Sequence, residues 1–144
     1  MQLTRAADYA VRMMIQLATL PPGTRTNRAA LAASCEIPEP FVGKILQSLS
    51  RAGLISSHRG VHGGFVLSEA TDAVSILHIV EAVEGPTLLN ICIKPGDTCN
   101  RKFWCPAHPV WLEAQQAMTA VLRRATLASL AASSKQGGSS WTSL

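Results

Sequence analysis

Apolar residues recur every three to four positions along much of the chain, which predicts amphipathic helices. The first predicted helix covers residues 4–20, where Thr4 caps it and the segment Pro21-Pro22-Gly23 ends it. The next predicted helices are one that Asn27 caps and that runs through Ser34, one over roughly Glu39–Ala52 that Gly53 ends, and one that Ser75 caps and that runs through Val83. Their apolar faces can form one core.

A hairpin is predicted after the third of these helices. Short strands are expected at Leu54–Ser57 and Phe65–Leu67, with the glycine-rich segment Arg59–Gly64 between them. The second and third helices, separated by a turn at 35–38, have helix-turn-helix spacing. A helix-turn-helix followed directly by a hairpin is typical of winged-helix proteins. The predicted fold class is therefore mainly α with a small β-hairpin wing, followed by a long dimerisation helix.

The second half of the chain is organised differently. Residues 86–108 have no regular period, whereas a helix with a period near 3.6 is predicted from about Val110 to Ala125. Because the earlier helices already form a core, we expect this helix to pack against a second copy of itself. Thr126 caps one further turn, and the Ser/Gly-rich residues 133–144 are expected to be disordered. The expected units are a DNA-binding winged-helix domain (1–84), a cysteine loop (85–108), a dimerisation region (109–132) and a tail (133–144).

Composition and charge narrow the class of protein. Of the 144 residues, 47% are hydrophobic and 15% are charged, which excludes a disordered or fibrous chain. The net charge is +4, and all of it lies in residues 1–64, where seven Lys and Arg residues accompany three acidic ones. This favours a polyanionic partner such as nucleic acid. Without a membrane-spanning segment or a signal peptide, we expect a cytoplasmic protein with no membrane partner.

The polar face of the third predicted helix carries side chains that can read DNA. Lys44, Gln47, Ser48 and Arg51 lie within about two turns of one another. Base edges in the major groove are recognised by such polar and forked side chains, with Gln47 suited to adenine and Lys44 and Arg51 to guanine or phosphate. A merely solvated helix face is the alternative, but the turn before it and the hairpin after it favour DNA.

The hairpin suits contact with the DNA backbone or the minor groove. Gly60, Gly63 and Gly64 let the main chain approach phosphates closely, and Arg59 is the expected minor-groove probe. His58 and His62 are weaker candidates, and Thr26 and Arg28 are placed for phosphate contacts. For Thr26 and Arg28, which begin the second helix, the alternative to a phosphate contact is a plain polar helix end.

Three cysteines lie in the irregular segment, in the pattern Cys92-x6-Cys99-x5-Cys105-x2-His108. Structural zinc usually takes paired Cys-x2-Cys ligands, and such pairs are absent here. Wider spacings place the thiols on separate parts of a loop, which favours an iron–sulfur cluster over zinc or a thiol switch, although all three stay open. The fourth cysteine, Cys35, is expected to be a packed core thiol.

Taken together, these features resemble the Rrf2 family of bacterial winged-helix regulators. The matching segments are residues 1–5, Asp8-Tyr-Ala-Val-Arg12, Lys44–Ile55, Arg59–Gly64, the three loop cysteines and Thr126-Leu-Ala, so that the resemblance covers about residues 1–132. It implies a homodimer in which Cys92, Cys99 and Cys105 hold an iron–sulfur cluster, with [4Fe–4S] favoured and [2Fe–2S] as the alternative.

The resemblance leaves two candidates for a fourth ligand. His108 matches the pattern of IscR-like members, and Asp8, supplied by the partner subunit, matches that of NsrR-like members. The Asp8-Tyr9 pair and Thr87–Cys92 favour the nitric-oxide-sensing NsrR branch, although Met13-Met14 is similar to RirA. From the residues alone, Asp8 also suits the first turn of its helix, where negative charge is favoured, and His108 suits a polar helix start.

The sequence thus predicts a transcription regulator, expected to be a repressor, that binds a palindromic double-stranded operator and senses nitric oxide, redox state or iron through its cluster. A zinc- or thiol-based winged-helix regulator is the alternative, and an iron–sulfur electron carrier is a third reading. No nucleophile–base pair or substrate pocket is legible, so an enzyme is not expected.

Overall fold

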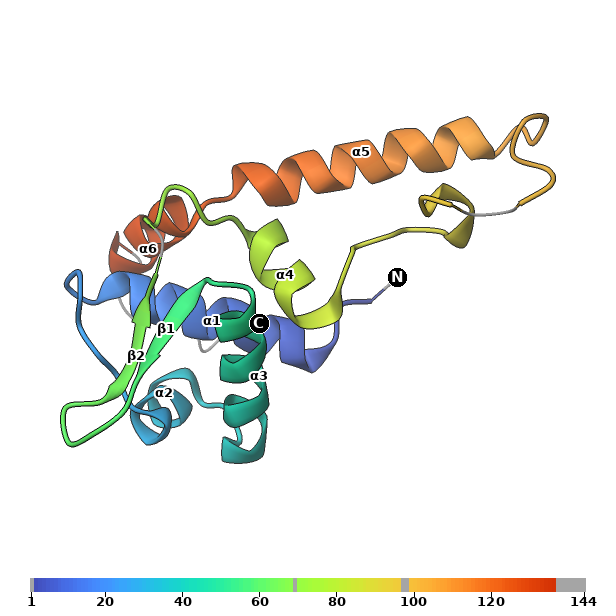
Figure 1. The fold of residues 1–144 in the computed structure, drawn as a ribbon. Helices are drawn as coiled ribbons and strands as arrows, with labels where there is room; N and C mark the ends of the chain where they lie inside the picture. The colour runs from blue at the N-terminus through green and yellow to red at the C-terminus, as the bar shows by residue number, and fades with distance from the viewer. Residues whose placement is uncertain (1, 69, 97–98, 137–144) are drawn as a thin grey trace.

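The computed structural model describes residues 2–68, 70–96 and 99–136, and Figure 1 shows a helical body from which one long helix projects. The elements in chain order are α1 (Arg5–Thr19), α2 (Arg28–Cys35), α3 (Glu39–Arg51), β1 (Ile55–His58), β2 (Gly64–Leu67), α4 (Ile76–Glu84), the 3-10 helix η1 (Ile91–Ile93), α5 (His108–Arg124) and α6 (Leu127–Gln136). This order confirms the predicted fold class. None of the helices in the described ranges is long and apolar enough to cross a membrane.

The predicted caps fix where the helices begin. The Thr4 hydroxyl accepts a hydrogen bond from the Ala7 N–H at 3.2 Å, and the Asn27 side chain accepts one from the Ala30 N–H at 2.8 Å. Ser75 and His78 form a reciprocal capping box at the start of α4. Each cap satisfies a backbone donor that has no partner inside the helix, and is worth about 1 kcal/mol.

Helix α1 forms the centre of the body. It packs against α2, α3, α4 and α6, and its Met13 and Met14 are completely buried. Leu46 and Leu49 of α3 reach the same core, as does Leu127 of α6. Full burial of each such side chain contributes about 1.5–3 kcal/mol.

The wing is an antiparallel hairpin in which β1 and β2 pair from Ile55↔Leu67 to His58↔Gly64. Thr26, just before α2, adds a short third pairing to β2. Its N–H donates to the Phe65 carbonyl at 3.0 Å, and the Phe65 N–H donates back at 2.9 Å. The hairpin is therefore attached to the start of α2 as well as to the end of α3.

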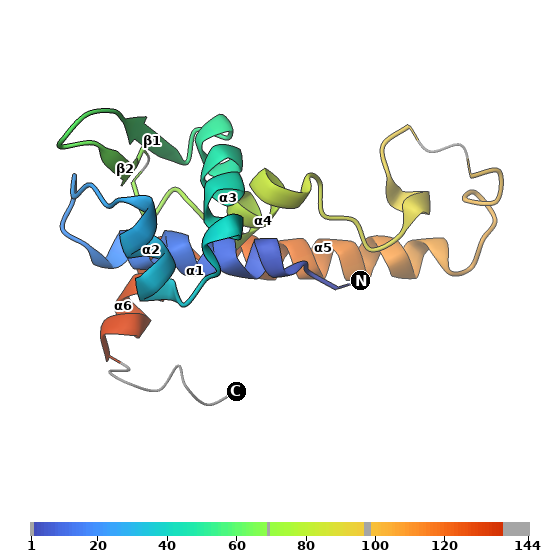
Figure 2. The same cartoon turned by 90° about the horizontal axis from the view of Figure 1, so that it is seen from below.

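Residues 85–124, called the arm below, leave the body after α4 and return at α6. Figures 1 and 2 both show α5 extending beyond the body, with the loop that contains η1 beside its N-terminal half. No residue of α5 is buried in the described chain. The arm is thus an insertion between two elements of the body.

Helix α6 corrects two predictions. It runs through Gln136 rather than for one turn, so residues 133–136 are helical where a disordered tail is predicted, and residues 137–144 lie outside the described chain. The reason is burial, because Leu127 and Ala131 face the core. Since α6 packs on α1, the winged-helix unit expected at 1–84 also lacks one of the helices that complete its core.

Candidate nucleic-acid interface and cysteine loop

Helix α3 presents a buried and an exposed face, as its amphipathic pattern predicts. Val42, Ile45, Leu46 and Leu49 are buried. The side chains of Lys44, Gln47 and Arg51 are exposed on the other face, and Ser48 is half-buried. Packing of the apolar face therefore orients the candidate DNA-reading residues away from the core.

A groove of about 850 Å³ runs between α2, α3 and the wing. Its lining residues, called the basic groove below, are Arg28, Gly43, Lys44, Leu46, Gln47, Ser50, Arg51, Ser57, Arg59 and Phe65. They bring together five residues predicted to contact DNA from three separate elements. The other four predicted residues, Thr26, Ser48, His62 and Gly63, do not line the groove.

The basic groove carries uncompensated positive charge. Its four cationic residues are accompanied by no Asp or Glu among the described lining residues. The ion pair found within the described ranges lies elsewhere, between Arg12 and Asp8 on α1 at 2.8 Å. A concave surface with this charge attracts a polyanion.

Arg28 lies directly over Gly43 of α3, a relationship that the sequence pattern does not reveal. A Cβ atom at position 43 would lie only 3.0 Å from Nη2 of Arg28. The missing side chain leaves the space in which this guanidinium rests. Gly43 therefore belongs to the candidate site, and the only signal in the sequence is a glycine inside a helix.

The tip of the wing is held by a residue that was not predicted to belong to the site. Arg25 donates from Nη1 to the His62 carbonyl at 3.0 Å. Gly63 has a steric role, since a Cβ there would lie 2.4 Å from the His58 carbonyl oxygen. Thr26 pairs with Phe65 through its backbone. His62 and Gly63 thus shape the tip.

The three loop cysteines lie in different local structures. Cys92 is in η1, Cys99 follows residues 97–98, and Cys105 precedes α5. All three are half-buried, and the four cysteines of the chain, each within the described ranges, form no disulfide. No three His, Cys, Asp or Glu side chains of the described residues lie close enough together to hold a metal ion. A single described chain therefore does not assemble the predicted ligand set.

The two candidates for a fourth ligand differ in their surroundings. His108 is the first residue of α5, its N–H donates to the Cys105 carbonyl at 3.2 Å, and its buried Nδ1 has no hydrogen-bond partner among the described residues. Asp8 lies in the first turn of α1, where its exposed carboxylate pairs with Arg12. The Asp8 carboxylate thus already has a partner on its own helix, four positions along the chain.

The loop is fastened at its start to both the body and α5. The Glu84 carboxylate accepts a hydrogen bond from the Thr4 N–H at 2.7 Å. Gln115 of α5 donates to the Thr87 carbonyl at 2.7 Å and accepts from the Leu89 N–H at 2.8 Å. Residues 84–89 therefore connect the N-terminal end of α1 with α5.

Cys35 lies apart from the loop, at the end of α2. Burial against the core raises the pKa of its thiol, and this effect is larger than the lowering by the Ser34 hydroxyl and by Arg12. This position is consistent with a packed thiol.

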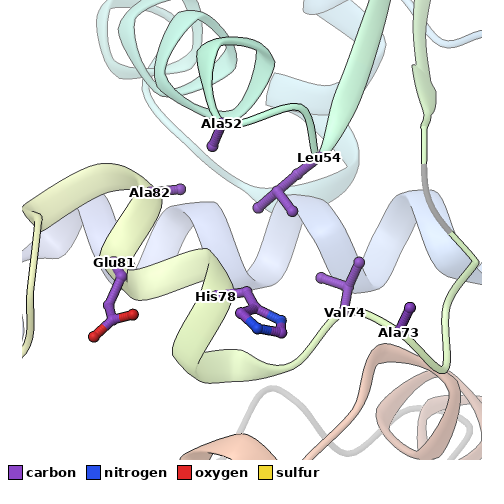
Figure 3. A pocket seen from close by; sticks show the side chains of 7 residues that line it. All are labelled: Ala52, Leu54, Ala73, Val74, His78, Glu81 and Ala82. Carbon is purple, nitrogen blue, oxygen red and sulfur yellow. The ribbon is translucent and has the colours of Figure 1, made fainter.

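A second hollow, of about 430 Å³, lies where the end of α3 and the start of β1 meet α4 (Figure 3). Its walls are mainly apolar, and His78 and Glu81 are its polar side chains. Both have structural roles, since Nδ1 of His78 accepts from the Ser75 N–H and Glu81 accepts from the Thr87 N–H. Both polar side chains of this hollow therefore already have hydrogen-bond partners within the chain.

Comparison with known proteins extends this description. Residues 3–133 match the Rrf2 family, described as iron-dependent transcriptional regulators. The chain is 35% identical over 131 residues to the HTH-type transcriptional regulator Rv1287 of Mycobacterium tuberculosis, covering 91% of this chain and 81% of the relative. It is 37% identical over 84 residues to the HTH-type regulator slr0846 of Synechocystis, covering 58% and 57%.

Two solved structures share the fold. CymR, the global cysteine regulator of B. subtilis, has a TM-score of 0.77 at 28% identity, with 92% of this chain and 98% of that chain covered. IscR of T. potens also has a TM-score of 0.77, at 20% identity, with 97% and 93% covered. The second likeness is one of fold alone.

Proposed function

The chain belongs to the Rrf2 family of DNA-binding transcriptional regulators, and from this premise we propose that it is a dimeric repressor whose cysteine loop holds an iron–sulfur cluster. The cluster would sense nitric oxide, redox state or iron supply. The family's members are regulators rather than enzymes, so the chemistry of the loop serves control of DNA binding.

The observation that carries the DNA-binding role is the basic groove. Arg28, Lys44, Arg51 and Arg59 line it without an acidic neighbour in the described chain. Each cation that neutralises a phosphate releases a condensed counterion. The salt slope, which is the fall in the logarithm of the affinity per tenfold rise in salt concentration, is therefore about 0.9 per contact. Gln47, also on the groove, is the residue we expect to read a base edge.

The exposed face of α5 supports a homodimer. Val110 and Val121 are 58% and 53% exposed, and Ala117 lies between them at helical spacing on the same exposed side. A helix with no buried residue of its own gains stability by burying this face against a second copy. Two copies related by twofold symmetry would place their wings on half-sites about one helical turn of DNA apart.

The residues of the loop fit an iron–sulfur group. Thiolates are the usual protein ligands of such clusters, and Cys92, Cys99 and Cys105 are half-buried and without disulfides. The buried Nδ1 of His108, three residues after Cys105, lacks a hydrogen-bond partner in the described chain. When bound, the cluster supplies a centre that reacts with nitric oxide and oxidants. The chain supplies the thiolates and, from His108 or the partner's Asp8, a more labile ligand.

A regulator that uses its thiols without a cluster is the second candidate. The likeness to CymR, named the global cysteine regulator of B. subtilis, at 28% identity over 92% of this chain supports it. The absence of a three-ligand group in the described single chain also fits this reading. Zinc on the same cysteines is its metal-bound variant.

Protein purified without air distinguishes these candidates. For the cluster, we expect a coloured protein with acid-labile sulfide and a native mass that exceeds that of the apoprotein by the mass of the cluster. Cys92→Ser should remove this excess mass, and the matched Cys35→Ser should not. Asp8→Ala and His108→Ala then identify the fourth ligand by loss of cluster or by a changed spectrum. Colourless protein without labile sulfide, even after reconstitution, contradicts the cluster, and metal analysis then separates zinc from free thiols.

DNA binding is measured by fluorescence anisotropy on a duplex selected from a random-sequence pool. Cluster-loaded, cluster-free and nitric-oxide-treated protein should bind with different affinities, and equal affinities would contradict the sensor role. Arg28→Ala should reduce the salt slope by about 0.9, as one lost phosphate contact requires. An unchanged slope for Arg28→Ala and for Arg51→Ala would remove the groove from the interface.

A further inference from the structure

We propose that Arg25 is a positioning residue of the wing, which holds the hairpin tip so that Arg59 stays in place in the basic groove. The inference deepens the proposed DNA-binding role of the groove and rests on it. It assigns a function to a residue that the sequence pattern does not distinguish from other exposed cations.

The contact that carries the proposal joins residues far apart in the chain. Nη1 of Arg25 donates to the His62 carbonyl at 3.0 Å across 37 positions of sequence. The adjacent Thr26 forms two backbone hydrogen bonds with Phe65, at 3.0 and 2.9 Å. The segment before α2 is thus hydrogen-bonded to β2 through its backbone and to the tip through the Arg25 side chain.

The tip itself is compact but has few external supports. The Gly63 N–H donates to the Gly60 carbonyl at 2.9 Å, which closes a turn within the tip. Among the described residues, the side-chain hydrogen bond that reaches 59–63 from outside the hairpin is the one from Arg25. Val61 is 99% exposed, so side-chain packing does not anchor the tip. Orientation of the tip therefore depends on Arg25.

The position of Arg59 gives this support a function. Arg59 lines the basic groove and immediately precedes the turn that Arg25 holds, whereas Arg25 does not line the groove. A carbonyl partner leaves the charge of Arg25 intact, so a direct phosphate contact is the competing role. The two roles differ in whether the effect of Arg25 requires Arg59.

A double-mutant cycle tests this dependence on the full-length dimer and the selected duplex. We expect Arg25→Ala to weaken binding about two- to tenfold, the change that one net hydrogen bond supports, with a change in salt slope no larger than that of Arg59→Ala. In an Arg59→Ala background, Arg25→Ala should change the affinity less than twofold. Arg25→Lys, which keeps a donor and the charge, should recover part of the affinity. Circular dichroism checks that each variant is folded.

Trypsin cleavage between Arg59 and Gly60 gives a readout independent of DNA. Release of the tip should raise the cleavage rate about two- to tenfold in Arg25→Ala, because cleavage follows the open population. The matched control Arg5→Ala, at an exposed arginine on α1, should leave both rate and affinity unchanged.

Three results would overturn the proposal. They are unchanged affinity and cleavage in Arg25→Ala, a full loss that persists in the Arg59→Ala background, and a fall in salt slope of about 0.9 when Arg25→Ala is added to that background, which marks a phosphate contact of Arg25 itself. If wild-type protein shows no salt-dependent binding to any selected duplex, the proposed role of the groove fails instead. A raised cleavage rate in Arg25→Ala would still establish the contact with the tip.

Discussion

The Gln115 amide holds the Thr87 carbonyl at 2.7 Å and, through its oxygen, the Leu89 N–H at 2.8 Å. One side chain of α5 thereby replaces the backbone partners that an irregular loop lacks. Because Thr87 is buried, these groups would otherwise lose their bonds to water without compensation.

Replacing Gln115 with leucine should release the start of the cysteine loop. Loss of two hydrogen bonds is expected to cost about 1–3 kcal/mol, largely as local opening. Hydrogen exchange of the Leu89 amide should therefore accelerate about tenfold or more, while amides of α1 keep their rates. Gln116→Leu is the matched control, because Gln116 is exposed and its side chain forms no hydrogen bond with the described residues of the loop. Equal exchange of the Leu89 amide in the two variants would show that the two hydrogen bonds of Gln115 do not order the loop.

The Gly43→Ala substitution should separate stability from DNA binding. Alanine is favoured over glycine inside a helix by about 1 kcal/mol, so the free energy of unfolding should rise. The new Cβ, 3.0 Å from Nη2 of Arg28, should displace that guanidinium and weaken DNA binding severalfold. Urea titration and anisotropy measure the two effects. In an Arg28→Ala background the substitution should cost no affinity, and a further loss there would contradict this route.

Placing a charge on the exposed face of α5 should weaken the proposed dimer. Val121→Glu introduces a carboxylate into the face proposed to meet a second copy, and burying it unpaired is costly. We expect the dimer dissociation constant to rise at least about tenfold, for a cost of 1.4 kcal/mol or more. Analytical ultracentrifugation detects the monomer. Gln116→Glu adds the same charge off the line of Val110, Ala117 and Val121, and similar dissociation in both variants would argue against this face.

Helix α6 should contribute to the stability of the winged-helix body. Leu127 is 1% exposed, so Leu127→Ala is expected to reduce the free energy of unfolding by about 2–5 kcal/mol. Leu3→Ala removes the same atoms from a side chain that is 42% exposed and should cost far less. Urea unfolding compares them, and similar midpoints would mean that α6 is not part of the core.

Cys35 should react slowly with alkylating agents because burial raises its pKa. Only the thiolate reacts, so at pH 8 a raised pKa leaves a smaller reactive fraction in the folded chain. In protein with the three loop cysteines changed to serine, iodoacetamide should modify Cys35 several times faster in urea than in buffer. The thiol's contribution to stability is present at lower pH and is lost as pH rises through the folded-state pKa. Equal rates would show that the thiol is accessible and unshifted.

Local signals in the sequence predicted most of the fold. Thr4, Asn27, Ser75 and Thr126 each cap the expected helix, because capping depends on the residue and its neighbours a few positions away. The length of α6 was underestimated, since its Ser- and Ala-rich sequence is a weak signal and burial on α1 decides the outcome.

The candidate site was predictable only in part. The exposed face of α3 follows from periodicity, and five of the predicted DNA-contact residues meet in one groove. Arg25 and Gly43 were missed because their roles come from contacts with His62 and Arg28 that only the tertiary structure creates. The cysteine ligands remain a prediction, since their assembly depends on more than the spacing in one chain.

The insertion of the arm between α4 and α6 affects how force would pass through the molecule. The arm leaves the body at the end of α4, after Glu84, and returns at the start of the same helix, where the Ile76 N–H donates to the Ala125 carbonyl at 3.0 Å and Ser75 pairs with Thr126. A segment attached at one point can swivel freely, whereas α5 is connected to both ends of α4 and also contacts it, so it acts as a lever on that helix. Torque on α5 is therefore expected to turn α4 and α6 together, and with them the α1 helix that both contact. In a dimer, a small change in the crossing angle of the two levers would then alter the separation of the two DNA-reading helices.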